Sequence, residues 1–250
     1  MTSSSSAKKL ARLKMSDSIW FRDWPATDVD QILSLSRFRQ HHKSEMIYRD
    51  GDADELIFML TGSAWTCMKS DHKSVRFGMV YGATLIGLSR LLTERFVDDP
   101  CYEFLAAEET LVMAIPARTL VGYLDARPQL WRAMTEAAVL YQRHCIKLAL
   151  VFYSGPVKDR LISALYQFGL SASLNAGQQP QQELAIPQEE LATLIQSSRQ
   201  HVNRALRELE SDNIVKLGYK RIEIVDAPAL ERLAVARLIG MATPTREKND

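Results

Sequence analysis

The sequence predicts an α+β protein in which one long helix joins a strand-rich N-terminal half to a helical C-terminal unit. Short apolar runs interrupted by glycine fill residues 32–116, which is the pattern of strands and turns. An apolar stripe at helical spacing then runs through residues 128–152. The breaker pair Gly155-Pro156 separates this stripe from short amphipathic helices and a β-hairpin. The 250 residues are enough for two domains or one large one.

The N-terminal half contains several strand signals. IYRDGD ends in a turn signal, ELIFMLTGSAWTCMKS is a β-rich run broken at Gly62, and SVRFGMVYGATLIG is broken by three glycines. TLVMAIP is a further strand that ends at Pro116. Strands of this length and spacing predict a small barrel or sandwich. Residues 1–14, which are serine-rich and then basic, and the polar residues 243–250 are expected to lack regular structure.

Residues 128–152 predict one long helix. Its apolar side chains recur every three or four positions, at Leu130, Met134, Ala137, Ala138, Tyr141, Cys145, Leu148 and Phe152. The stripe is longer than a small domain needs, so we expect a homodimer in which two copies of the helix form the seam. The alternative is that the helix packs on its own barrel.

The C-terminal unit predicts two helices, a tight turn and a hairpin. VKDRLISALYQFGL reads as an amphipathic helix that ends at Gly169, ELAIP as a short strand, and PQEELATLIQ as a helix that begins at Pro187. The next helix lies in IQSSRQHVNRALRELESDNIV, with Val202, Leu206 and Leu209 as its apolar stripe. VKLGYKRIEIVD then forms two strands and ALERLAVARLIG a last helix. This is the layout of a winged helix-turn-helix.

The start of the second helix has two candidate caps. Ser197 or Ser198 can act as the N-cap, and Gln200 follows Ser197 by three residues, as in a capping box. Arg199, Asn203 and Arg204 lie off the apolar stripe, so one face of this helix is expected to pack while the other stays exposed.

The exposed face suits double-stranded DNA. The net charge of the chain is only +1, so any contact with a polyanion must come from a local patch. In a winged helix-turn-helix the second helix enters the major groove, where arginine reads guanine and asparagine or glutamine reads adenine. Side chains at the helix start and on the hairpin would hold phosphates. The expected DNA-binding residues are Ser197, Ser198, Arg199, Gln200, His201, Asn203, Arg204, Lys216, Lys220 and Arg221. The alternative is a row of solvated helix charges.

Other classes of protein find little support in the sequence. G-x-S-x-G, H-E-x-x-H and Gly-rich phosphate loops are absent, so we expect no enzyme, no catalytic residue and no metal site. The sequence has no run of 18 apolar residues and no signal-peptide core, so no membrane association is expected. Cys67, Cys101 and Cys145 are widely spaced, which suits the reducing cytoplasm.

The motif IPQEELATLIQSSRQHVNRALRELESDNIV and the order of elements resemble the bacterial Crp/Fnr family of transcription regulators, named after the cyclic-AMP receptor protein. RDGDADELIFMLTGSAW resembles the first half of the family's cyclic-nucleotide-binding β-roll. The resemblance covers residues 32–225 and implies an N-terminal arm (1–25), a β-roll sensor domain (26–127), a dimerisation helix (128–153) and a winged helix DNA-binding domain (154–250). It also implies a homodimer on a palindromic operator, with RNA polymerase as a partner.

The same resemblance implies roles for residues of the second helix. Arg199, Gln200, Asn203 and Arg204 match family residues that meet base edges, and Arg204 matches the arginine that reads guanine. Several relatives have glutamate where this chain has Gln200, so we expect a different half-site at that base pair. Relatives often have glycine where Gln196 stands, so Gln196 is expected to adopt a left-handed backbone conformation.

The roll departs from the family at the ligand site. The resemblance places Leu88 where relatives have a glutamate for the ribose, and Pro100-Cys101 where they have Arg-Ser for the phosphate. Nearby acidic residues would repel a phosphate, so we expect a ligand other than cyclic AMP, with Arg90 or Arg95 as the only off-register replacements. An apolar effector is the alternative, and its cavity would be lined by Phe77, Met79, Leu85, Leu88, Tyr102, Phe104 and Tyr141. Such residues are equally typical of a core.

Two further interpretations stay open. Haem is a candidate cofactor, held by His72 with Cys67 or by His144 with Cys145, whereas the clustered cysteines of an iron–sulfur site are absent. The competing function is a cyclic-nucleotide-like signalling module whose C-terminal unit docks a protein partner. The effector, the operator sequence and the choice between activation and repression do not follow from the sequence.

Overall fold

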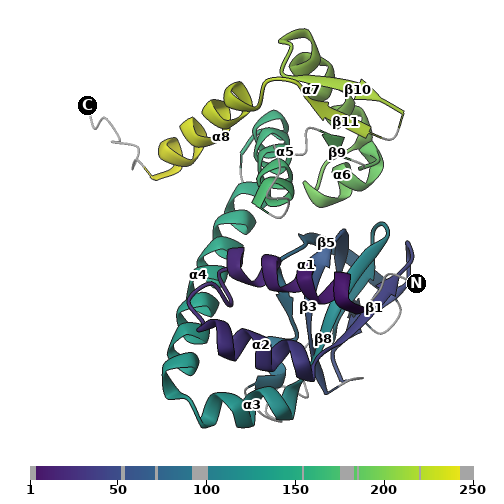
Figure 1. Ribbon diagram of the computed structural model, residues 1–250. Helices are drawn as coiled ribbons and strands as arrows, with labels where there is room; N and C mark the ends of the chain where they lie inside the picture. The colour runs from purple at the N-terminus through teal and green to yellow at the C-terminus, as the bar shows by residue number, and fades with distance from the viewer. Residues whose placement is uncertain are drawn as a thin grey trace. The chain divides into compact units, whose positions relative to one another are not determined.

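The computed structural model divides the chain into two compact units, Met1–Arg143 and His144–Asp250. It describes residues 4–51, 54–70, 73–91, 101–153, 155–174, 183–184, 186–219 and 221–242. Figure 1 labels the helices and strands of both units. Each unit is described by itself below.

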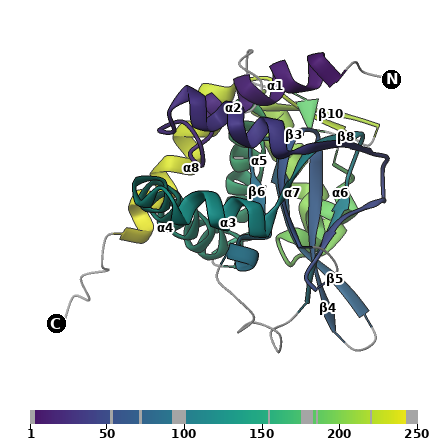
Figure 2. The same ribbon diagram turned by 60° about the horizontal axis from the view of Figure 1, so that its bottom comes forward.

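Unit 1 contains two four-stranded antiparallel sheets, which confirms the predicted roll. The first sheet has the order β1-β8-β3-β6, with bounds Arg37–His41, Thr110–Pro116, Glu55–Thr61 and Leu85–Ile86. The second has the order β2-β7-β4-β5, with bounds Met46–Arg49, Cys101–Ala106, Ser63–Ser70 and Lys73–Tyr81. Figure 2 shows the β4–β5 hairpin projecting from the roll.

Strand β3 connects two hydrophobic clusters because its side chains alternate between the faces of the first sheet. Leu56, Phe58 and Leu60 belong to a cluster that also contains residues of the helices. Ile57 and Met59 belong to a second cluster, which also contains residues of the second sheet. All five residues are almost completely buried. The first sheet is therefore covered on both faces.

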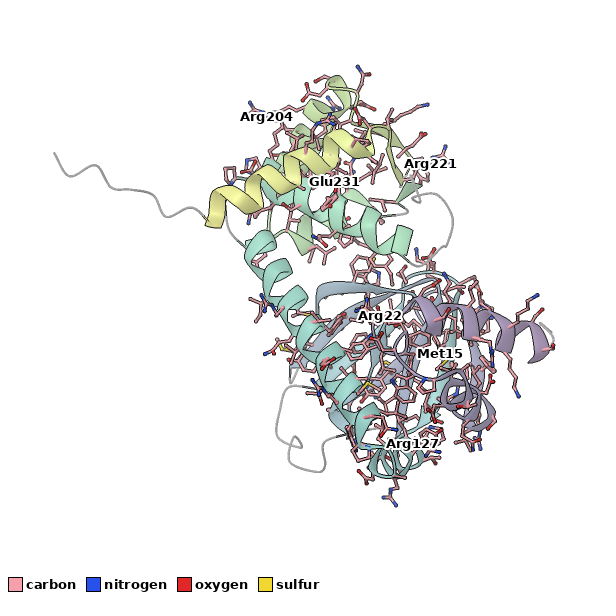
Figure 3. All side chains as sticks on the ribbon, turned by 60° about the vertical axis from the view of Figure 1, so that its left-hand side comes forward. Met15, Arg22, Arg127, Arg204, Arg221 and Glu231 are labelled. Atoms are coloured by element: carbon pink, nitrogen blue, oxygen red, sulfur yellow. The ribbon has the colours of Figure 1, made fainter. Side chains whose placement is uncertain are left out.

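The N-terminal segment is helical, so the expectation that residues 1–14 lack regular structure was wrong for residues 4–14. Helix α1 spans Ser4–Asp17, and Ala7, Ala11 and Met15 are buried at intervals of four residues. This short stripe, hidden among lysines in the sequence, lies on one helix face. Trp20, Phe21 and Trp24 follow it and are also buried in the first cluster. Figure 3 shows Met15 among the side chains of unit 1.

Two more helices complete the roll. Helix α2 spans Ala26–Leu35, so the strand-rich region begins after this helix rather than at residue 32. Helix α3 spans Ala117–Asp125 and follows β8 directly; a short 3₁₀ helix, η1, covers Leu88–Leu91. Both α2 and α3 contribute residues to the first hydrophobic cluster.

Helix α4 spans Pro128–Tyr153, in agreement with the predicted long helix. Leu130, Met134 and Ala137 are buried in the first cluster, and the Tyr141 ring lies 5.4 Å from that of Trp20. This part of the stripe therefore packs on the helix's own roll, as in the alternative interpretation, and is not available as a seam between chains. The side chains of Leu148 and Phe152 lie outside the described part of the structure.

A polar cluster holds the start of α4 to the roll. The Tyr123 hydroxyl donates a hydrogen bond to Asp28 in α2, and Arg127 Nε lies 3.0 Å from the same carboxylate. The Arg127 guanidinium also stacks over the Tyr123 ring at 4.0 Å. Burial and the neighbouring Asp28 raise the pKa of Tyr123, so the phenol stays protonated as the donor. The cluster joins α2 and α3 to Arg127, the residue directly before α4, which is labelled in Figure 3.

Unit 2 has the predicted helix-turn-helix and hairpin. Its helices are α5 (Val157–Leu174), α6 (Gln188–Leu194), α7 (Arg199–Ser211) and α8 (Ala227–Ala242). A three-stranded sheet has the order β10-β11-β9, with bounds Val215–Gly218, Arg221–Ile224 and Glu183–Leu184. Helix α5 runs through Gly169 instead of ending there, because a glycine inside a helix costs only about 1 kcal/mol relative to alanine. None of the described helices is both long and apolar enough to cross a membrane.

Candidate nucleic-acid interface

The turn between α6 and α7 depends on a left-handed residue. Gln196 has φ of +49°, as expected for the position where relatives often have glycine. The Ser197 amide donates to the Ala192 carbonyl at 2.9 Å and the Gln196 amide to Thr193 at 3.2 Å, which closes the end of α6. Leu194 and Ile195, on the N-terminal side of Gln196, are buried. Their burial holds the backbone in a conformation that glutamine rarely adopts.

Ser198 caps α7. Its Oγ accepts a hydrogen bond from the His201 amide at 3.2 Å, which satisfies one of the free amides at the helix start. The residue three positions after the cap is therefore His201 and not Gln200. The capping box expected for Ser197 and Gln200 does not form, and Gln200 stays exposed.

The apolar stripe of α7 is buried and its polar face is open. Val202, Leu206 and Leu209 are completely buried, as predicted. The opposite side forms an open groove lined by Arg199, Gln200, Asn203, Arg204, Arg207, Glu208 and Ser211. Figure 3 shows Arg204 at the outside of unit 2. Four of the predicted DNA-binding residues are thus brought together on one surface, which is called the α7 groove below.

The α7 groove carries more positive than negative charge. Its lining contains three arginines, Arg199, Arg204 and Arg207, and one acidic residue, Glu208. Glu208 is engaged by Lys158 of α5 at 3.1 Å and lies 3.6 Å from Arg204 Nε. The Arg204 side chain is 83% exposed. An ion pair this exposed is worth less than about 1 kcal/mol, so Arg204 can exchange Glu208 for another acceptor.

The hairpin places two more predicted residues on the surface of unit 2. Lys216 in β10 and Arg221 in β11 are exposed, and Tyr219 at the turn is 85% exposed. The Leu217 amide donates to Glu210 Oε1 of α7 at 2.8 Å, so the hairpin is tied to α7. Lys220 lies outside the described residues.

Sequence reasoning missed three residues that line the α7 groove, namely Arg207, Glu208 and Ser211. Arg207 and Ser211 lie four and eight residues after Asn203, a spacing that would have placed them on its face of the helix. Gln188 was missed as well. Its Oε1 accepts a hydrogen bond from Asn203 Nδ2 at 2.9 Å, and a contact between residues fifteen positions apart leaves no periodic signal.

The residues expected to line an apolar effector cavity lie in different places. Leu85, Leu88 and Tyr141 belong to or pack against the first cluster, beside Trp20 and Phe21. Phe104 packs against the second cluster, near Tyr48. Met79 is half-buried and Tyr102 is exposed, and the side chain of Phe77 lies outside the described part of the chain. The space between the roll and α4 is filled by the chain's own N-terminal aromatic residues.

The position that corresponds to the family's nucleotide site is described only in part. Leu88, in the place of the ribose-binding glutamate, packs against apolar residues. The Tyr48 hydroxyl donates to Asp50 at 2.9 Å and also interacts with the Arg90 side chain, whose Nε is buried without a hydrogen-bond partner among the described residues. The Tyr48 ring lies within 2.9 Å of where a Cβ on Gly87 would stand. Arg95 and Pro100 lie outside the described residues.

The structure describes only the cysteines of the two candidate haem pairs. Cys67 is completely buried, with its thiol 3.9 Å from the Trp65 carbonyl. His72 and the side chain of His144 lie outside the described parts of the chain, whereas Cys145 is exposed. Within the ranges that the structure describes, no three histidine, cysteine, aspartate or glutamate side chains are grouped as metal ligands.

Comparison with known proteins identifies the C-terminal domain. Residues 159–233 match the family model of the Crp-like helix-turn-helix domain. No curated protein matches the sequence of the chain.

Solved structures share the fold of most of the chain. One is a regulator assigned to the Crp/Fnr family, from Eubacterium rectale (19% identity, 86% of this chain and 96% of that chain, TM-score 0.59). Another is TTHB099, a CRP-family transcriptional regulator from Thermus thermophilus (18%, 79% and 96%, 0.59). A third is the c-di-GMP-responsive global regulator CLP from Xanthomonas campestris (19%, 81% and 100%, 0.56). The predicted fold class and the resemblance to Crp/Fnr regulators are confirmed.

The two candidate caps give a direct test of the start of α7. Ser198→Ala is expected to lower the free energy of unfolding by about 1 kcal/mol, because it removes the acceptor of the His201 amide. Ser197→Ala is the matched control and is expected to change stability by less than about 0.5 kcal/mol. Urea denaturation followed by circular dichroism measures both. A larger loss in the Ser197 variant would contradict the assignment of the cap.

Proposed function

We propose that this chain, which carries a Crp-like helix-turn-helix domain, is a sequence-specific DNA-binding transcription regulator that acts as a homodimer on a palindromic operator. The observation that supports this most is the α7 groove, where three exposed arginines lie opposite a completely buried apolar stripe. A helix held in this way can enter a major groove with its polar face toward the bases.

The proposed roles follow from side-chain chemistry and position. Arg204 and Arg199 bond to O6 and N7 of guanine, and Gln200 and Asn203 read adenine. Ser197, Ser198 and His201 lie at the start of α7, where free amides favour phosphates. Lys216, Lys220 and Arg221 hold the DNA backbone from the hairpin. Arg207, one turn beyond Asn203, joins the α7 set.

If the α7 groove reads DNA, alanine substitutions of residues that contact bases and of residues that contact the DNA backbone are expected to change DNA binding in different ways. Arg204→Ala is expected to lower affinity for the preferred site by roughly 1–3 kcal/mol and to flatten preference at one base pair. Lys216→Ala, the control on the hairpin, is expected to weaken all sequences alike and to reduce the salt dependence. Gel-shift titrations at two salt concentrations measure both. If neither variant changes binding and the protein shows no salt-dependent DNA affinity, a C-terminal unit that docks a protein partner is favoured instead.

The proposed dimer seam uses exposed apolar side chains of α4. Val139 is nine residues after Leu130, which at about 100° per residue places it on the opposite side of the helix. Val139 and Ile146 are seven residues apart and are 49% and 54% exposed, while Leu140 beside them is 49% exposed. Apolar side chains at this spacing suit a two-helix seam. In the dimer, the two α7 helices would lie one DNA turn apart, about 34 Å.

A charge on this face tests the seam. Ile146→Glu is expected to weaken dimerisation at least about tenfold, because the seam would bury an unpaired carboxylate at a cost of more than about 1.4 kcal/mol. Gln129→Glu adds the same charge near the exposed start of α4 and is the control. Sedimentation equilibrium measures the dissociation constants. Equal values for both variants and the wild type would place the dimer contact elsewhere.

The proposed ligand of the roll is a molecule other than cyclic AMP. The apolar packing of Leu88, in the place where relatives have a ribose-binding glutamate, supports this. A ligand that favours one separation of the two α7 helices would change operator affinity by shifting the dimer between two states. RNA polymerase as a partner and the cytoplasm as the location are part of the same proposal.

Cyclic nucleotides provide the test of the ligand class. Cyclic AMP and cyclic GMP are expected to leave operator affinity unchanged and to release no heat in calorimetric titration. Native mass spectrometry of the purified dimer searches for a retained molecule, and absorbance in the Soret region reports haem. A cyclic nucleotide retained by the dimer or raising its operator affinity would overturn this part of the proposal.

A further inference from the structure

One hydrogen bond joins the two helices of the helix-turn-helix at the edge of the α7 groove. Asn203 Nδ2 donates to Gln188 Oε1 at 2.9 Å. Gln188 is the first residue of α6, and Asn203 lines the α7 groove. Both side chains are half-buried, and among the described residues neither has another side-chain hydrogen bond. The amide of Asn203 is therefore held by one partner at its nitrogen end.

The orientation of an asparagine amide decides which bases it can meet. The oxygen end accepts hydrogen bonds and the nitrogen end donates them. In the major groove, adenine and cytosine present an exocyclic amine, which donates, whereas guanine and thymine present a carbonyl oxygen, which accepts. With one Nδ2 hydrogen held by Gln188, Oδ1 and the second Nδ2 hydrogen of Asn203 are left to meet a base.

We infer that Gln188 is a positioning residue that makes the regulator select adenine or cytosine at one base pair of each half-site. This inference rests on the proposed function. Asn203 Oδ1 accepts from the amine of the selected base, and the second hydrogen on Nδ2 stays available for N7 of adenine, so adenine is preferred over cytosine. With guanine or thymine at this position, Asn203 Oδ1 would face a carbonyl oxygen of the base. Two acceptors cannot form a hydrogen bond with each other.

Two substitutions at Gln188 distinguish the effect of its hydrogen-bond acceptor from the effect of its side-chain size. Gln188→Met keeps the length of the side chain but offers only a weak thioether acceptor. Gln188→Glu keeps the acceptor at nearly the same place. Asn203→Ala identifies the base pair concerned, because it removes the reading side chain. Glu189→Ala, at an exposed neighbour on α6, is the control for changes unrelated to the hydrogen bond.

Selection from a DNA library with randomised half-sites is the experiment, with thermal unfolding as the check on folding. The wild type and the Glu189 control are expected to prefer adenine, then cytosine, by about tenfold over guanine or thymine at one position. Asn203→Ala is expected to lose this preference because it removes the reading side chain. Gln188→Met is expected to lose it at the same position because the released Asn203 amide can rotate by 180°. Gln188→Glu is expected to keep it, even if its added charge lowers affinity for all sequences alike.

The results separate this inference from the proposed function. A wild-type protein that selects no sequence contradicts the proposed function. A wild type that selects a palindrome while Gln188→Met keeps the full preference at the Asn203 position overturns the inference alone. Loss of the preference in Gln188→Glu as complete as in Gln188→Met also overturns it, because the acceptor would then not be what positions Asn203. The guanine preference assigned to Arg204 is expected to be unchanged in all four variants.

Discussion

The burial of one apolar stripe on α7 is the constraint on which the candidate interface depends. Val202, Leu206 and Leu209 are completely buried, and each such side chain contributes about 1.5–3 kcal/mol. Turning α7 about its axis would expose this stripe and bury charged side chains, which costs several kcal/mol more. The rotation of α7 is therefore determined by its hydrophobic side, and the arginines on the other side are exposed as a consequence.

The surrounding contacts determine where α7 begins and what it presents. The strained backbone of Gln196 ends α6 just before Ser198 caps α7, so the first turn of α7 starts at a defined residue. Glu210 then ties the hairpin to the same helix through the Leu217 amide. These contacts lie within one small domain, so the side chains of the α7 groove and of the hairpin are supported by the same set of contacts. Precise readout of bases requires such a rigid support.

In unit 1 the aromatic residues of the N-terminal segment connect the long helix to the roll. Trp20 packs on Tyr141 of α4 and Phe21 packs edge-on against Phe58 of β3, so one segment bridges the long helix and the roll. This packing accounts for both departures from the expected sensor. The buried stripe of α4, Leu130, Met134 and Ala137, packs against other residues of the same chain. The space proposed for an apolar effector is filled by side chains of the same cluster.

The sequence by itself determined the features that repeat along the chain. The stripe of α7 and the length of α4 follow from periodicity, which a few neighbouring residues settle. The left-handed turn at Gln196 followed from the resemblance to regulators that often have glycine there. Tertiary structure alone decided which faces meet. The helical stripe of α1, the outward face of α4 and the bond from Gln188 to Asn203 depend on residues distant in the chain. A side chain's partner across the fold is set by the packing of whole elements, and no local pattern records that packing.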